Sequence, residues 1–285
     1  MRCGCCTSNS SCQKLFKLPK NRPALMGILN VTPDSFSDGG RHFDFDTAIE
    51  AGMSMVDDGA DLIDVGGEST RPDADPVSVE EELTRTIPVI QALAIRGCHV
   101  SIDTMKHEVA KAALDAGAFL VNDVSGLRDP AMLELVQSRL AWVCIMHMQG
   151  GPKTMQARAV YADVVQEIRD YLIHVAGLLA LPSEQVWIDP GIGFGKTLSH
   201  NLALIRHVDR FVDTGYPVLI GVSRKTFIGR VLGSESEPLG IEERLEGTLA
   251  AQVYAQLQGA RVIRAHDVKA SRRAIDLVAA IQSTS

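Results

Sequence analysis

Short apolar runs alternate with segments of helical spacing along nearly the whole chain, and this alternation decides the fold class. The runs that we predict as strands are residues 24–29, 61–66, 99–103, 119–122, 141–147, 186–189, 217–222 and 261–265. The segments that we predict as helices are about 46–58, 78–95, 107–116, 130–138, 161–180, 199–213, 240–258 and 268–282. Because each run is followed by one helical segment, the pattern indicates parallel strands joined by helical crossovers.

Eight such units in a chain of 285 residues have the number and length of a (β/α)8 barrel. The alternative is an open, doubly wound sheet, which more often has unequal spacing or an appended second domain, and the sequence has no linker or low-complexity break. We therefore predict an α/β fold, a single (β/α)8 TIM barrel with its active site at the C-terminal ends of the strands. The barrel is expected to occupy residues 23–285, after a flexible, Cys-rich leader at residues 1–22.

The composition limits the partners and the compartment. A net charge of −7 argues against a nucleic-acid partner, although a local cluster of Arg and Lys can still bind a small anion. No apolar run approaches the roughly 20 residues that span a bilayer, and the N-terminus lacks the apolar region of a secretory signal, so we expect a cytoplasmic protein without a membrane partner. Cys98 and Cys144 are predicted as buried, reduced thiols. The leader's four cysteines have no matching set at zinc-like spacing.

Almost every predicted strand ends in a residue that is capable of chemistry, whereas the strand starts have no comparable set. These residues are Asn30; Glu68, Thr70 and Arg71; Asp103; Asn122 and Asp123; His147; Asp189; Ser223, Arg224 and Lys225; and Arg264, His266 and Asp267. Any one of them could be a helix cap or a satisfied core group, and for Asp123 and Asp267 that reading stays open. In a barrel, however, all these ends meet on the face that carries the active site. The sequence therefore predicts an enzyme.

The residue types at the strand ends indicate the kind of ligand. Asp103, Asn122 and Asp189 offer acceptors and an amide, which suit a flat heterocycle rich in N–H donors. Other strand ends supply positive charge beside the last two strands, where barrels often bind phosphate; these residues are Lys225, Arg264 and His266. A heterocycle that carries a phosphate or diphosphate satisfies both halves.

The glycine-rich stretch "DPGIGFGKT", residues 189–197, is a near-miss for two nucleotide-binding motifs. A P-loop needs four residues between its first Gly and the Gly-Lys pair, and Gly191 and Gly195 enclose only three. In the dinucleotide fingerprint the third glycine would come one residue later. We expect these glycines to let the backbone pass close beneath the ligand.

Eight segments of the chain resemble dihydropteroate synthase, the pterin-binding family of folate biosynthesis. They are "MGILNVTPDSFSDGG", "DVGGESTRPDADPVSVEEEL", "SIDT", "NDVSGL", "MHMQGGPKTMQ", "IDPGIGFGKTLSHN", "GVSRKTFIG" and "RVIRAHDV". The resemblance extends from about Met26 to Ile281, and the first two segments together are highly specific. It implies a (β/α)8 barrel, which agrees with the strand count, and a homodimer that packs through late barrel helices.

The activity that the resemblance implies is a group transfer with Mg²⁺ as cofactor. The enzyme would condense 6-hydroxymethyl-7,8-dihydropterin diphosphate with p-aminobenzoate and release 7,8-dihydropteroate and diphosphate. If diphosphate departs first, a carboxylate such as Asp103 would stabilise the pterin cation, while Mg²⁺, Arg264 and His266 would stabilise the leaving anion. The arylamine nucleophile is neutral and needs no strong general base, which explains the lack of a Ser-His-Asp set.

The resemblance also distributes the site residues among the substrates. It implies that the pterin binds to Asp103, Asn122, Met146, Asp189, Phe194 and Lys225, and that the catalytic residues are Asp103, Lys225, Arg264 and His266. For p-aminobenzoate it implies Phe36, Thr70, Arg71, Pro72 and Ser223. For the diphosphate it implies Asn30, Thr70, Arg264 and His266, with Asn30 as the metal ligand. The segment from Asn30 to Gly40 would combine this fixed ligand with a mobile lid that carries Phe36.

Three positions depart from the family pattern. Asp73 stands where Gly is expected after "STRP", and Met105 and His107 replace the usual "SKPE" context. Asp73 could alter the closure of its loop or the fit of sulfonamide analogues, or it could be a solvent-facing substitution.

Two other functions compete with the synthase. One is the pterin-binding module of corrinoid-dependent methyl transfer, which would share the pterin acids but would not need a diphosphate clamp. "SRK" at 223–225 and "RAH" at 264–266 therefore favour the synthase. The other is a barrel that serves only as a partner protein, and the intact set of polar strand ends argues against it.

Overall fold

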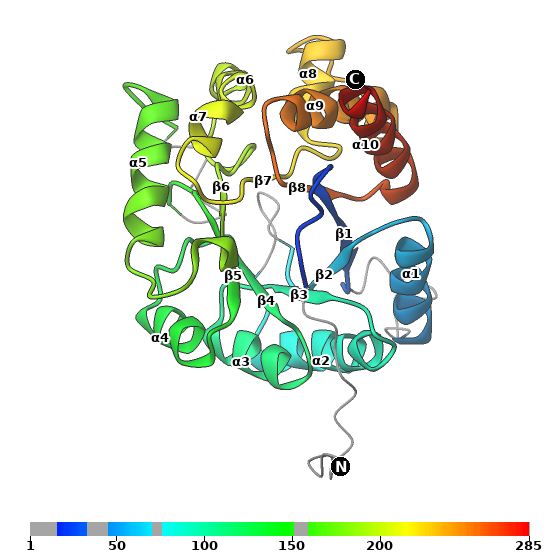
Figure 1. Ribbon diagram of the computed structural model, residues 1–285, viewed down its shortest axis with the longest axis vertical. Coiled ribbons are helices and arrows are strands. Elements are labelled where there is room, and N and C mark those ends of the chain that lie inside the picture. Colours follow the sequence, from blue (N-terminus) through cyan, green and yellow to red (C-terminus); the bar gives the residue numbers. More distant parts are fainter. Residues whose placement is uncertain (1–15, 33–44, 70–75, 151–158, 285) are drawn as a thin grey trace.

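The structure, a computed structural model, describes residues 16–32, 45–69, 76–150 and 159–284. Within these ranges one eight-stranded parallel sheet curls into a barrel that helices surround (Figure 1). The strand order is β6-β5-β4-β3-β2-β1-β8-β7, and a single parallel bridge between Ile188 and Val218 joins the two outer strands, β6 and β7. The predicted (β/α)8 fold is confirmed.

Each of the eight predicted runs matches one strand, and β1 and β4 extend one residue beyond their runs. The strands are β1 Ala24–Asn30, β2 Leu62–Gly66, β3 Val100–Asp103, β4 Leu120–Asp123, β5 Trp142–Met146, β6 Val186–Asp189, β7 Leu219–Ile220 and β8 Val262–Ala265. The register aligns Asn30 with Gly66, Gly66 with Asp103, and Asp103 with Asn122, so the ends of the first four strands lie at one level. This alignment brings the polar strand ends to one face of the barrel.

The helices follow the predicted segments with two differences. They are α1 Phe45–Asp57, α2 Val79–Ile95, α3 His107–Asp115, α4 Pro130–Arg139, α5 Val164–Ala176, α6 Leu198–Arg206, α7 Val208–Val212, α8 Thr226–Leu232, α9 Leu245–Leu257 and α10 Val268–Ser283, with 3-10 turns η2 Ser183–Gln185 and η3 Ile241–Glu243. The predicted helix 199–213 is divided at His207, whose φ is −114° and ψ 35°. Helix α8 was not predicted, because Gly229 in its middle weakens the helical signal. That glycine is required, since a Cβ there would lie 2.7 Å from the carbonyl oxygen of Leu239.

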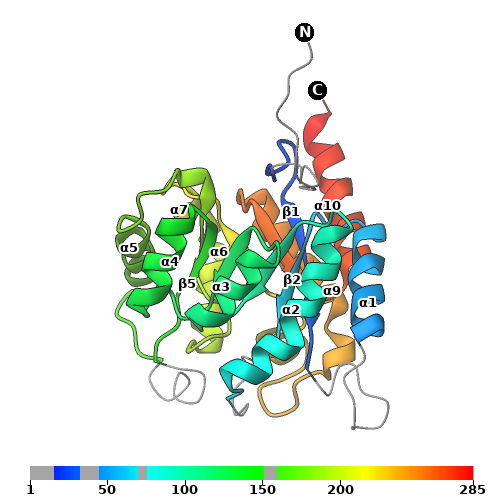
Figure 2. The same ribbon diagram turned by 90° about the horizontal axis from the view of Figure 1, so that it is seen from below.

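Helices cover the outside of the sheet, and α1 and α10 both pack against β1 (Figure 2). The main apolar core lies between sheet and helices and includes Leu25, Leu29, Ile63 and Ile102, each at most 1% exposed. None of the helices within the described ranges is long and apolar enough to cross a membrane. Cys98 and Cys144 are buried free thiols, as predicted.

A second apolar cluster fills the N-terminal end of the barrel. Phe16, which lies within the expected leader, is only 6% exposed and stacks on Phe119 with ring centroids 4.8 Å apart. The rings of Trp142 and Trp187 meet edge to face beside it, with centroids 5.9 Å apart. Residues 1–15 of the expected leader, with its four cysteines, lie outside the described residues. The barrel interior is thus closed by aromatic rings at one end and lined by polar groups at the other.

Candidate active site

The centre of the polar face is a buried carboxylate, Asp64, that the sequence analysis did not select. Its oxygens accept hydrogen bonds from Ser101 Oγ, from Asn122 Nδ2 at 3.0 Å and from Arg264 Nε at 2.6 Å. Asp64 lies within β2 between Ile63 and Val65, and its side chain is fully buried. Because a charged residue is almost never fully buried without partners, an Asp inside such an apolar strand is the signal that could have found it.

Asp103, predicted to bind the pterin and to act in catalysis, lies beside this network. Its Oδ2 accepts a 2.7 Å hydrogen bond from Arg264 Nη2, whereas its Oδ1 is buried and has no hydrogen-bond partner among the described residues. Burial raises the pKa of Asp103 to about 7 against the opposing charge of Arg264, and Asp64, Glu82 and Asp123 raise it further. The unpartnered oxygen offers an acceptor to an N–H group of a ligand.

Arg264, predicted to bind diphosphate, is held between two carboxylates. Burial alone would lower the pKa of its guanidinium, but Asp64 and Asp103 raise it above the ordinary range, so Arg264 is permanently charged. Its Nε is paired with Asp64 and its Nη2 with Asp103. The arginine therefore neutralises the acidic centre of the site, whatever else it binds.

Lys225 and Asp189 approach the site from the last strands. Lys225 precedes α8, and its Nζ donates to the carbonyl of Ile192 and lies 4.6 Å from the centre of the Phe194 ring. Burial lowers the pKa of Lys225 to about 8, with Asp189 opposing that change. Asp189, at the end of β6, is 7% exposed; burial raises its pKa, although its Oδ1 accepts from the amide of Gly191 at 2.7 Å.

Two glycines of the near-miss motif allow close approaches within the protein. A Cβ on Gly191, whose φ is 68°, would lie 1.9 Å from the carbonyl oxygen of His147. A Cβ on Gly193, whose φ is 87°, would lie 3.1 Å from Cδ of Lys225. Both residues adopt a left-handed conformation that favours glycine. These close approaches are to His147 and Lys225, so the glycines shape the loop that carries Phe194.

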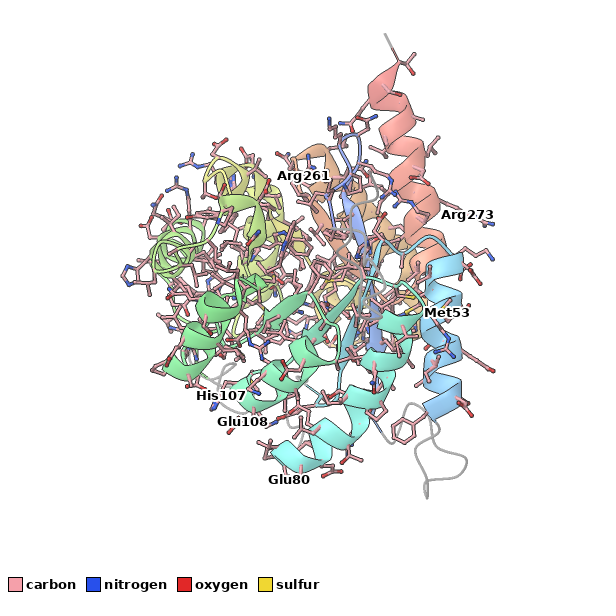
Figure 3. All side chains as sticks on the ribbon, turned by 60° about the horizontal axis from the view of Figure 1, so that its bottom comes forward. Met53, Glu80, His107, Glu108, Arg261 and Arg273 are labelled. Atoms are coloured by element: carbon pink, nitrogen blue, oxygen red, sulfur yellow. The ribbon has the colours of Figure 1, made fainter. Side chains whose placement is uncertain are left out.

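The predicted apolar walls belong to one small cluster. Met146 and Phe194 pack together with Val124 and Met148. Met105, one of the departures from the family pattern, joins the same cluster. His107, another departure, contacts Asp129 at 2.8 Å. Figure 3 labels His107 at the start of α3, at the opposite end of the barrel from Arg261, so this departure lies on the same side as the polar strand ends.

Ser223 and His266, which the resemblance assigned to different substrates, are in direct contact. The backbone amide of His266 donates to Ser223 Oγ at 3.1 Å, and its Nδ1 lies 3.0 Å from the same oxygen. The contact joins the ends of β7 and β8. Phe36, Thr70, Arg71, Pro72 and Asp73 lie outside the described residues, so their predicted contacts with p-aminobenzoate and diphosphate stay predictions.

Two further strand-end residues have structural partners. Both oxygens of Asp123 accept backbone N–H groups, from Ser125 at 2.7 Å and Leu127 at 2.9 Å, so Asp123 caps the following turn. His147 Nδ1 lies 3.2 Å from Nζ of Lys196, and burial together with Lys196 lowers the pKa of His147 to about 3. His147 is therefore a neutral side chain that holds Lys196.

A metal could be held only in part by the protein. The described ranges contain no group of three or more His, Cys, Asp or Glu side chains with metal-ligating geometry. Asn30, the predicted ligand, ends β1, and its Oδ1 and Asp103 Oδ2 would each lie 3.8 Å from a Cβ on Gly66. Since Mg²⁺ is commonly bound by one or two protein oxygens plus substrate phosphates and water, Asn30 Oδ1 as one such oxygen fits Mg²⁺ bound together with a diphosphate.

Comparison with known proteins adds to this geometry. The profile of the family described as pterin binding enzyme matches residues 26–266. The chain is 46% identical to dihydropteroate synthase of Escherichia coli (strain K12) over 270 residues, which are 93% of this chain and 94% of that protein. It is also similar to dihydropteroate synthase of Xanthomonas albilineans with 4-aminobenzoic acid, at a TM-score of 0.85 and 42% identity over 93% of this chain and 94% of the other. The complex of the Xanthomonas albilineans enzyme with 7,8-dihydropteroate gives a TM-score of 0.82 at 40% identity, over 93% and 95% of the two chains.

Proposed function

The chain belongs to the family of pterin-binding enzymes, and we infer that it is the transferase of folate biosynthesis that condenses 6-hydroxymethyl-7,8-dihydropterin diphosphate with p-aminobenzoate. Its products are 7,8-dihydropteroate and diphosphate. The observation that carries this conclusion is the 46% identity to a dihydropteroate synthase, which extends over 93% of the chain. The polar face of the barrel is compatible with the same chemistry.

The pterin is proposed to bind at the buried end of the site. Asp103 Oδ1 is a buried acceptor without a partner among the described residues, and a pterin N–H group could donate to it. Asn122 and Asp189 would supply the neighbouring polar contacts, and the apolar cluster of Met146 and Phe194 would face the ring. Lys225 lies over the Phe194 ring and would close this pocket from the side of α8.

In the reaction, the C–O bond between the pterin methylene and the diphosphate breaks and its electron pair leaves with the diphosphate oxygen. The methylene cation that forms is delocalised over the pterin ring. Asp103, when ionised, would stabilise this cation in a buried site where a fixed charge acts strongly. The arylamine nitrogen then forms the new C–N bond with its lone pair and gives up a proton to the departing diphosphate or to water, for which no strong base is needed.

The departing diphosphate requires positive charge near His266 and Arg264. Arg264 is committed to Asp64 and Asp103, and we propose that it also contributes its charge to the diphosphate side of the site. Asn30 would share a Mg²⁺ ion with the diphosphate. When bound, this ion would supply additional positive charge to the leaving anion.

The p-aminobenzoate site is proposed to include Ser223, whose Oγ lies against His266.

A homodimer remains part of the proposal, and partly exposed apolar side chains on α8 and α9 support it; these are Val231, Leu232, Tyr254 and Leu257. A cytoplasmic location also remains a prediction of this function.

The decisive experiment measures diphosphate release with both substrates and with each omitted in turn. We expect release to depend on p-aminobenzoate and to match the formation of 7,8-dihydropteroate. Release that is indifferent to p-aminobenzoate would refute the synthase. The corrinoid-linked pterin module is not favoured, and it would bind a folate without any diphosphate release.

A further inference from the structure

The ends of β7 and β8 have little backbone pairing to hold them together. Strand β7 contains only Leu219 and Ile220, and its register with β8 pairs them with Val262 and Ile263. The chain beyond these pairs carries Ser223, Lys225 and His266. Side-chain contacts must therefore set how the two strand ends face each other.

Arg224 has an unusual backbone between two of these residues. Its φ is 57°, a left-handed conformation that is unfavourable for any residue except glycine, asparagine and aspartate. The surrounding chain enforces it from both sides, because the amide of Arg224 donates to Oγ1 of the fully buried Thr248 at 3.0 Å and its carbonyl accepts from Nη1 of Arg244 at 3.0 Å. Such strain persists only where neighbouring contacts over-determine it, and it gathers at functional sites.

The side chain of Arg224 makes the connection to β8. Its Nε donates to Oδ2 of Asp267 at 2.9 Å and its Nη2 donates to Oδ1 at 2.5 Å, which is a two-point contact of fixed orientation. The hydrogen bond from Arg224 lowers the pKa of Asp267, so the pair stays charged. Both side chains are mostly buried, at 29% and 17% exposure.

This ion pair lies next to a second contact between the same two strand ends. Ser223 contacts His266, one residue before each member of the pair. Two adjacent rungs, 223 with 266 and 224 with 267, therefore join the segments where backbone pairing has ended. On the other side of Arg224, the side chain of Lys225 passes Gly193 and reaches Ile192 and Phe194.

We propose that Arg224 and Asp267 are a positioning pair that fixes how the chain after β7 lies against the chain after β8. Lys225 and His266 are thereby held where both can act on the two bound substrates. This role deepens the proposed function and rests on it. Neither side chain needs to touch a substrate. Loss of the pair would leave the acidic centre at Asp64 intact but would shift the groups that meet the diphosphate and the arylamine.

Two variants test the pair. Asp267→Asn removes the charge that orients Arg224, and Arg224→Gly removes the side chain while relieving the left-handed strain. For both we expect kcat to fall by at least about tenfold, because small misplacements of reacting groups are costly.

We expect the thermal midpoint to stay within about 4 °C of wild type. Binding of free 6-hydroxymethylpterin, measured by calorimetry, should weaken by a smaller factor than kcat falls, because Asp103, Asn122 and Asp189 make no contact with the pair and only the Lys225 side of the pocket would move. Arg224→Lys should recover part of kcat, since it restores a charge but not the two-point contact.

Glu242→Gln is the matched control. Glu242 contacts the same guanidinium at 3.4 and 3.5 Å, but its side chain is 79% exposed. Exposed pairs contribute little, so we expect kcat within about twofold of wild type.

Wild-type kcat in both Asp267→Asn and Arg224→Gly would overturn the positioning pair while leaving the synthase function standing. A fall in kcat that is matched by equal losses of free pterin binding and thermal stability would overturn it too, because that pattern is general damage to the fold. If wild-type protein shows no p-aminobenzoate-dependent diphosphate release, the function itself fails and the positioning role fails with it.

Discussion

Arg264 Nη2 lies 2.7 Å from Oδ2 of Asp103, so the carboxylate proposed to stabilise the pterin cation is already paired with a permanent cation. Only Oδ1 of Asp103 is without a partner among the described residues. The two oxygens can therefore have separate tasks, one in holding the side chain and the other in meeting the ligand.

Asp103→Asn should keep the fold and slow turnover by roughly 10²-fold or more, because the variant loses a preorganised charge beside the developing cation. Steady-state kinetics measure the loss, and circular dichroism checks the fold. The fold is expected to survive because Arg264 keeps its 2.6 Å contact with Asp64. Activity near that of wild type would remove Asp103 from the proposed role.

Arg264→Ala should reduce the free energy of unfolding by about 3–5 kcal/mol, because it leaves the buried Asp64 charge without its cation. Urea unfolding measures this change. In the protein that remains folded, binding of the pterin diphosphate should weaken much more than binding of the free pterin, as calorimetry with both ligands would report. Equal losses for the two ligands would contradict a contribution of Arg264 to the anion site.

The pH dependence of kcat/KM should be a narrow bell. Asp103 must be ionised, and its pKa is raised to about 7, so activity should increase as pH rises through that value. Lys225 must be protonated, and its pKa is lowered to about 8, so activity should decrease as pH rises through that value. These limbs report the free enzyme. Lys225→Arg should remove the alkaline limb, because arginine does not titrate in this range. An alkaline limb unchanged in that variant would assign it to another group.

Phe16→Ala should lower the free energy of unfolding by about 3–5 kcal/mol and leave kcat nearly unchanged. Phe16 is 6% exposed and packs at the N-terminal end of the barrel, away from the polar strand ends. Denaturant unfolding and steady-state assays on one preparation separate the two effects. A large loss of kcat in fully folded protein would show that this aromatic cluster influences the site.

The strands could be predicted because buried parallel strands produce continuous apolar runs, and polar residues follow at the end of almost every run. Boundaries were least accurate at β7, where the run 217–222 contains a strand of two residues. Helix α8 escaped prediction because the glycine that its packing requires also weakens helical propensity.

The hydrogen bonds and ion pairs between the side chains of the site could not be predicted in the same way. Arg264 bonds to residues 200 and 161 positions away in the chain, and no local pattern specifies which carboxylate a side chain will meet. The sequence therefore indicated Arg264 as a ligand group but not its pairing with Asp64 and Asp103. The positioning pair of Arg224 and Asp267 could not be predicted either, because it also joins residues that are distant in the chain. It depends, in addition, on a backbone conformation that arginine rarely adopts.

The barrel sheet is least well paired between β6 and β7. These strands are joined by the single bridge between Ile188 and Val218, while the other pairs of neighbouring strands form ladders. Asp189 is the last residue of β6, and Lys225 follows β7 in the chain. A pterin bound by both Asp189 and Lys225 would connect β6 and β7, where the sheet has the least backbone pairing. Substrate occupancy and the integrity of the closed barrel would then be thermodynamically linked, so that each favours the other.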